Sequence, residues 1–109
     1  HVEVQYTARA GEALVTAFGT PEGKAFGLIV GAPAAIGVVM ADAAVKSANV
    51  DVVGYQSPSS SAMSNEVILQ ICGDSGAVKQ AVKVAREVGI TLLGTMGSEP
   101  KNTGESYII

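Results

Sequence analysis

The segment Gly73-Asp74-Ser75-Gly76 is the part of the chain in which a residue type and its neighbours could do covalent chemistry. A serine hydroxyl becomes a nucleophile when a histidine removes its proton and a carboxylate orients that histidine. The only histidine is His1, at the start of the chain, where a catalytic base would be poorly held. Asp74 and Ser75 also stand where a helix start needs a capping oxygen. We therefore predict a helix cap here and no catalytic residue.

Residues that bind metals, phosphates or cofactors are sparse. One histidine and one cysteine, with scattered carboxylates, give no ligand cluster at the spacings of metal sites. The turn Gly31-Ala32-Pro33 opens a predicted helix, but it lacks the lysine and the glycine spacing of a phosphate-binding loop. We predict no metal site and no cofactor, and an ordinary strand-to-helix turn at this point.

A neutral, hydroxyl-rich loop is the most function-like segment. Its side chains donate and accept hydrogen bonds without carrying a charge. On composition alone, contact with small molecules and a plain solvent-exposed loop are equally good interpretations. The polar side chains that we single out are Gln56, Ser57, Ser59, Ser60, Ser61, Ser64 and Asn65.

The composition fits a single domain, residues 1–109, with apolar material to spare. The chain is 48% hydrophobic and 16% charged, and its mean hydropathy is +0.35. This exceeds what one small core needs, so we expect part of the apolar surface to contact other subunits. Because the chain starts at His1 and not at methionine, we expect it to be a piece of a longer protein.

Charge and residue usage argue against several partners. A net charge of −3, with three tyrosines, two phenylalanines and no tryptophan, gives neither the basic patch nor the stacking platform that nucleic acids need. No apolar run reaches the roughly 18 residues that span a membrane. The lone Cys72 fits a reducing cytosol, and we expect it to be buried in a strand.

Hydrophobic periodicity predicts strands and helices along the whole chain. Strict alternation marks the first strand, and Gly89 is the expected end of the last helix. An extended tail, Gly97–Ile109, should follow the last strand. The predicted elements are strand Val2–Thr7, helix Glu12–Phe18, strand Ala25–Val30, helix Pro33–Ala48, strands Val50–Tyr55 and Glu66–Cys72, a helix from Asp74 or Ser75 to Gly89, and strand Ile90–Thr95.

From Ala25 onward this order is that of the ferredoxin-like split βαβ core. The fold class is therefore α+β, with an extra strand and short helix in front. The last helix should bury Val78, Ala81, Val82, Ala85 and Val88, and the helix Pro33–Ala48 should bury Ile36, Val39, Met40, Ala43 and Ala44.

The outer side of the helix Pro33–Ala48 has an unusual composition. Its charged residues are only Asp42 and Lys46, spaced as an i,i+4 pair. Small, uncharged outer residues allow another backbone to approach closely, so an interface explains them better than local helix propensity. These residues are Ala34, Gly37, Val38, Ala41 and Val45.

The stretch Asp42–Val50, followed by Val53-Gly54-Tyr55, resembles the signature of bacterial-microcompartment (BMC) shell domains. Gly73–Val78 is similar to the start of the family's second helix, and the element order resembles the circularly permuted version of the fold. The leading Val4–Ala10 and trailing Gly97–Asn102 resemble the second domain of tandem-domain shell proteins of the propanediol- and ethanol-utilisation type. The resemblance covers nearly the whole chain.

This resemblance implies a structural protein and no enzyme. Members of the family form flat hexagonal tiles, with six domains in each ring, and tandem-domain members form trimers. The tiles pave a cytoplasmic organelle beside other shell proteins, and pores in them pass small metabolites. Lys46 and Asn49 fall at the tile edge, where neighbouring tiles meet. The Gln56–Asn65 loop falls where unpermuted members carry their pore loop, and it is longer and richer in serine; the leading strand Val2–Thr7 is the other candidate lining.

A regulatory small-molecule-binding domain of the ACT type is the alternative function, because it shares the split βαβ order. It would bind a ligand at a dimer interface. An enzyme that uses Ser75 is a remote third reading. The number of domains in the assembly separates the first two functions.

Overall fold

A computed structural model of the chain describes residues 1–19, 21–57 and 65–95. Every predicted element between Val2 and Gly73 is confirmed, with ends that differ by at most one residue. The elements are β1 Val2–Thr7, α1 Glu12–Phe18, β2 Ala25–Gly31, α2 Ala34–Ser47, β3 Asp51–Gln56, β4 Val67–Gly73 and α3 Ser75–Thr95.

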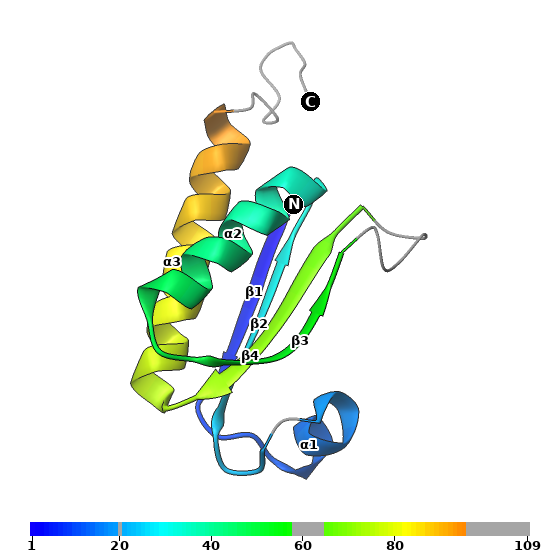
Figure 1. Cartoon of the computed structure of the whole chain (residues 1–109), viewed down its shortest axis with the longest axis vertical. Helices are drawn as coiled ribbons and strands as arrows, with labels where there is room; N and C mark the ends of the chain where they lie inside the picture. Colours follow the sequence, from blue (N-terminus) through cyan, green and yellow to red (C-terminus); the bar gives the residue numbers. More distant parts are fainter. Residues whose placement is uncertain (20, 58–64, 96–109) are drawn as a thin grey trace.

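The strands form one four-stranded sheet in the order β1-β2-β4-β3, and every neighbouring pair is antiparallel. β2 and β3 are therefore parallel to each other with β4 between them, which confirms the split βαβ arrangement. α2 and α3 lie side by side on one face of the sheet, and α1 lies apart from them at one end (Figure 1). The leading strand β1 occupies the sheet edge beside β2.

The predicted last strand, Ile90–Thr95, is wrong, because α3 continues to Thr95. Gly89 does not end the helix but is buried inside it, and a Cβ at this position would lie 2.6 Å from Met40 Sδ and 2.8 Å from Val2 Cγ2. β1 pairs with β2 over its full length, so the edge that a strand after α3 would need is already taken. The predicted tail, Gly97–Ile109, lies outside the described residues.

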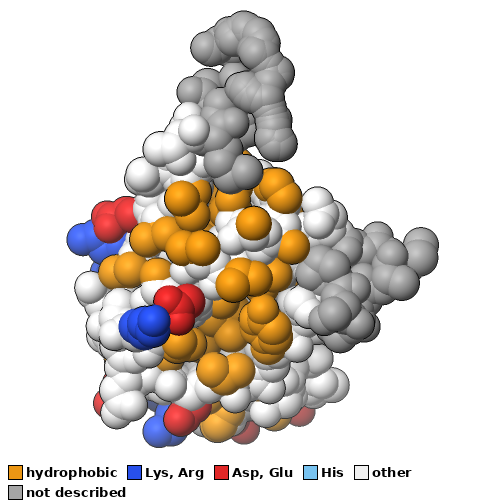
Figure 2. All heavy atoms as spheres, turned by 45° about the horizontal axis from the view of Figure 1, so that its top comes forward, with side chains coloured by type: hydrophobic (Ala, Val, Ile, Leu, Met, Phe, Trp, Pro, Cys, Tyr) orange, Lys and Arg blue, Asp and Glu red, His pale blue; other side chains and the backbone are white. Residues whose placement is uncertain are grey.

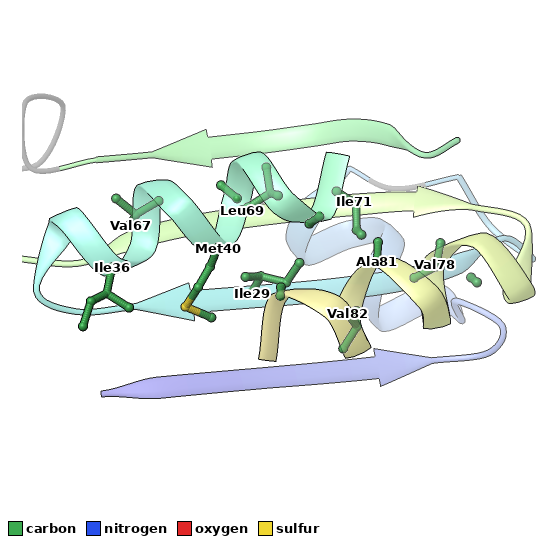
Figure 3. Packing of buried hydrophobic residues seen from close by; sticks show 13 residues of the cluster. Ile29, Ile36, Met40, Val67, Leu69, Ile71, Val78, Ala81 and Val82 are labelled. Atoms are coloured by element: carbon green, nitrogen blue, oxygen red, sulfur yellow. The ribbon is translucent and has the colours of Figure 1, made fainter. Parts of the chain in front are cut away.

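The hydrophobic core lies between the two long helices and the sheet (Figure 3). The predicted stripe of α3 is confirmed at four positions, whereas Val88 is only half-buried. Alternate residues of β2 and β4 point toward the helices, as the two-residue period of a strand requires. The largest side chains with almost no exposed surface are Ile29, Ile36, Met40, Val67, Ile71 and Val78.

The stripe of α2 is wrong in part. Val39, predicted to be buried, is 44% exposed, and Ala43 is half-buried. Gly37 and Ala41, predicted to face outward, are buried. The helix is turned so that Gly37 meets Gly31 of β2, where a Cβ on Gly31 would lie 2.6 Å from the Gly37 Cα. Small residues occur on all sides of this helix, so the sequence pattern does not determine which side faces the sheet.

The second face of the sheet is apolar where α1 covers it. The rings of Phe18 on α1 and Phe26 on β2 are stacked, with centroids 5.1 Å apart. Phe26 and Cys72 are buried on this side, which confirms the expectation for the cysteine. α1 ends at Gly19, whose φ of 72° is the left-handed conformation that favours glycine.

The buried position of Gly89 predicts the effect of adding one methyl group. Gly89→Ala should lower the free energy of unfolding by about 1–3 kcal/mol, because its Cβ would overlap Met40 and Val2. Urea denaturation followed by circular dichroism measures the change.

Gly76→Ala is the matched control on the same helix, because a Cβ there meets nothing within 4 Å. It should raise stability by up to about 1 kcal/mol, the usual helical advantage of alanine over glycine. Equal effects of the two substitutions would contradict the close approach at Gly89.

Candidate functional site

The residues predicted at the tile edge lie together where α2 ends. Lys46 occupies the last turn of α2, and its Nζ lies 3.0 Å from Asp42 Oδ2. A cation in this turn also interacts favourably with the C-terminal end of the helix dipole. The Lys46 and Asp42 side chains are 74% and 56% exposed, and Asn49 is exposed in the link to β3. Because the Lys46 side chain is exposed, a further partner can contact its charge at low desolvation cost.

The described part of the predicted pore loop is confined to its two ends. Gln56 is the last residue of β3, Ser57 follows it, and Asn65 comes two residues before β4. Both Gln56 and Asn65 are exposed. Ser59, Ser60, Ser61 and Ser64 lie outside the described residues.

An apolar surface covers the side of the molecule where α2 runs beside β3. Four side chains that are 40–54% exposed form what we call the α2–β3 surface: Val38, Val45, Val52 and Tyr55. A hollow of about 290 Å³ lies between them, with Ala41 and Leu69 also in its wall and Asp42 as its one charged group. Figure 2 shows hydrophobic side chains gathered on this side of the molecule.

The sequence pattern predicts only the α2 half of this surface. Val38 and Val45 belong to the predicted outer side of α2, and both are exposed. Val52 and Tyr55 belong to a predicted strand, and Tyr55 also to the stretch that resembles the family signature, but neither was predicted to lie on an exposed apolar surface. They are exposed because β3 is an edge strand of the sheet, beside which no further strand lies in the described part of the chain. No sequence signal identifies an edge strand without the sheet order.

The serine considered as a nucleophile has a structural contact. Ser75 is the first residue of α3, and its Oγ shares a hydrogen bond with the Tyr6 hydroxyl of β1. Tyr6 also donates to the Ser75 carbonyl at 3.4 Å. The His1 side chain lies 3.5 Å from Glu3 Oε1. The contacts of Tyr6 with Ser75 tie the first strand to the start of α3.

In the part of the chain that the structure describes, no three metal-ligating side chains come together. None of its helices has the length and hydropathy that crossing a membrane requires.

The model of the BMC domain family matches residues 25–99. The bacterial microcompartment shell protein PduB of Citrobacter freundii is 65% identical to this chain over 109 residues. That alignment covers 99% of this chain and 40% of the relative.

Solved structures of shell proteins share the fold. EtuB from Clostridium kluyveri superposes with a TM-score of 0.85 at 46% identity, covering 89% of this chain and 43% of that chain. A trimeric bacterial microcompartment shell protein PduB superposes with a TM-score of 0.83 at 54% identity, covering 99% and 48%. The chain thus spans less than half of each of these proteins. None of these matches supports the alternative of a regulatory ACT-type domain.

The contact between Tyr6 and Ser75 predicts coupled losses of stability. Tyr6→Phe and Ser75→Ala should each lower the free energy of unfolding by about 0.5–1.5 kcal/mol, because each removes one partner of the hydrogen bond. The double variant should cost little more than either single one, as measured in urea denaturation.

Asp74→Ala provides the comparison, because Asp74 stands just before α3 at the capping position. Its loss of about 0.5–2 kcal/mol should add to that of Tyr6→Phe. Additive losses for Tyr6→Phe with Ser75→Ala would contradict the shared hydrogen bond.

Proposed function

Because the chain belongs to the BMC domain family, we propose that it is a structural building block of a bacterial microcompartment shell, without a catalytic role. The observation that carries this proposal is the α2–β3 surface. Burying the exposed half of each of its side chains yields on the order of 1 kcal/mol, and no described segment of the chain offers that burial, so a neighbouring molecule would supply it. The similarity of this chain to a trimeric shell protein supports the same proposal.

A second apolar area favours assembly into a ring. On the outer side of α3, Ile90 is 45% exposed, beside a hollow of about 250 Å³ lined by Glu87, Val88, Thr91 and Leu92. α3 packs over β1 and β2, whereas the α2–β3 surface lies at the opposite edge of the sheet. Contact between two different surfaces is a head-to-tail contact, which generates a ring when the rotation from one copy to the next closes.

We propose a ring of six domains. The ring would contain six copies of this chain, or three copies of a tandem-domain protein in which residues 1–109 form the second, C-terminal domain. Its neighbours are other shell proteins, and the shell lies in the cytoplasm. The coverage of less than half of each relative supports a tandem parent.

In this proposal the two predicted sites have separate roles. Lys46 and Asn49 stand at the tile edge, and the exposure of both supports contact with a neighbouring tile. The Gln56–Asn65 loop lines an opening that passes small metabolites. Its uncharged hydroxyls would replace the hydrogen bonds of a small polar molecule with water without binding that molecule strongly.

Assembly through the α2–β3 surface is tested by placing a charge on it. The unaltered chain should have the mass of six domains in multi-angle light scattering at micromolar concentration. Val52→Asp should reduce that mass to that of one domain, because a carboxylate buried among apolar side chains loses its hydration without gaining a partner.

Ala13→Asp is the control, since it adds the same charge to an exposed position of α1. It should leave the assembly intact. A clean monomer for the unaltered chain would overturn the proposal, as would a Val52→Asp variant that keeps the full mass.

The edge role of Lys46 is tested by its removal. Lys46→Ala should leave each ring intact and reduce the formation of sheets seen by electron microscopy, because the side chain is exposed and contributes about 0–1 kcal/mol to folding. Lys79→Ala, an exposed lysine of α3, is the matched control and should form sheets normally. Equal sheet formation by both variants would argue against the edge role.

A further inference from the structure

The sheet face opposite α2 and α3 holds a cavity of about 480 Å³ next to α1. This volume lies in the range of small-molecule sites, which is about 300–1,000 Å³. It is lined by two residues of α1 and by one or two residues from each of β2, β3 and β4. These residues are Ala17, Phe18, Leu28, Val30, Gln56, Ile68 and Gln70.

The polar groups of this cavity are two carboxamides on adjacent strands. Gln56 pairs with Ile68 and Gly54 pairs with Gln70 in the β3–β4 register, so the two glutamines lie near each other. Neither side chain hydrogen-bonds to another residue in the described part of the chain. Each carboxamide therefore has a donor and an acceptor available to a bound molecule.

Gly54 makes room for one of these groups. A Cβ at position 54 would lie 2.5 Å from Gln70 Oε1, so any larger residue would displace the carboxamide. A strand glycine often marks the close approach of another group, and here that group is the Gln70 side chain. The position of the Gln70 carboxamide in the cavity thus depends on the missing side chain at Gly54.

The rest of the lining defines the chemistry of the occupant. Among the described residues the lining contains no ionisable side chain, so a charged molecule would lose hydration without meeting an opposite charge there. Leu28, Val30 and Ile68 offer an apolar floor, and Phe18 stands beside it. A three-carbon alcohol would leave most of the volume empty, whereas a planar ring compound would cover the floor and reach the carboxamides.

We propose that this cavity binds an uncharged ring compound with an apolar face and an amide-like edge, a carboxamide or a heterocyclic amide. The two glutamines would pair with the donor and acceptor of that edge, as carboxamides do with the edge of adenine. The site lies within one domain and does not depend on the proposed assembly.

Nicotinamide is the probe, and saturation-transfer difference NMR on the whole chain measures its dissociation constant. Nicotinate, of the same shape but anionic at pH 7, should bind at least about tenfold more weakly, because the lining offers it no cation. Toluene lacks the polar edge and should bind about tenfold more weakly too.

Two variants test the named residues. Gln70→Leu and Gly54→Ala should each weaken nicotinamide binding about five- to tenfold, the first by removing the amide and the second by displacing it. Gln80→Leu, at an exposed position of α3, is the control and should bind normally. Circular dichroism of each variant establishes that it is folded, and Gly54→Ala keeps the lining residues unchanged if Gln70→Leu unfolds.

Three results would overturn the proposal: no saturable nicotinamide signal, equal binding of nicotinamide and nicotinate, or unchanged binding in the folded variants. Light scattering on the same samples separates this inference from the proposed function. Rings that form but bind no nicotinamide overturn the cavity proposal alone. Monomers that do bind it overturn the assembly proposal alone.

Discussion

The backbone of α2 meets the backbone of β2 where neither segment has a side chain. A Cβ on Gly31 would lie 2.6 Å from the Gly37 Cα, and a Cβ on Gly37 would lie 2.5 Å from the Val67 Cβ. The helix therefore packs directly against the sheet. This short distance between helix and sheet determines which residues of the helix are buried. Met40 then reaches Gly89 of α3, so the second helix is held against the first at another glycine. The two-helix layer depends on these close contacts at Gly31, Gly37 and Gly89.

The close packing of α2 on the sheet also affects the exposed surface of the molecule. The outer side of the helix and β3 line one hollow, and their exposed valines and Tyr55 form an apolar area around it. The sole charged group in its hollow, Asp42, is paired with Lys46 at the end of the helix. The opposite face of the sheet is also apolar in its centre but carries two uncharged carboxamides. The first surface suits a protein neighbour, and the second suits a small neutral molecule.

Periodicity predicted most of the fold because the strands and helices of this chain have clear ends. Alternation marked β1, and the continuous apolar run Ala25–Val30 marked β2. The prediction failed after Gly89, since a glycine that permits close packing inside a helix looks in sequence like one that ends it. It also failed for the buried side of α2, where small residues on every side leave the 3.6-residue period without contrast.

The sequence by itself determined the order of elements as far as Gly73, the split βαβ core, the lack of a histidine beside Ser75, and the excess of apolar residues that an assembly would bury. Tertiary structure decided which strand occupies the edge beside β2, and with it that Val52 and Tyr55 are exposed. It also brought Gln56 and Gln70 to one cavity. The physical reason is that local propensity and periodicity act between near neighbours in sequence, whereas strand pairing and exposure depend on contacts between distant segments.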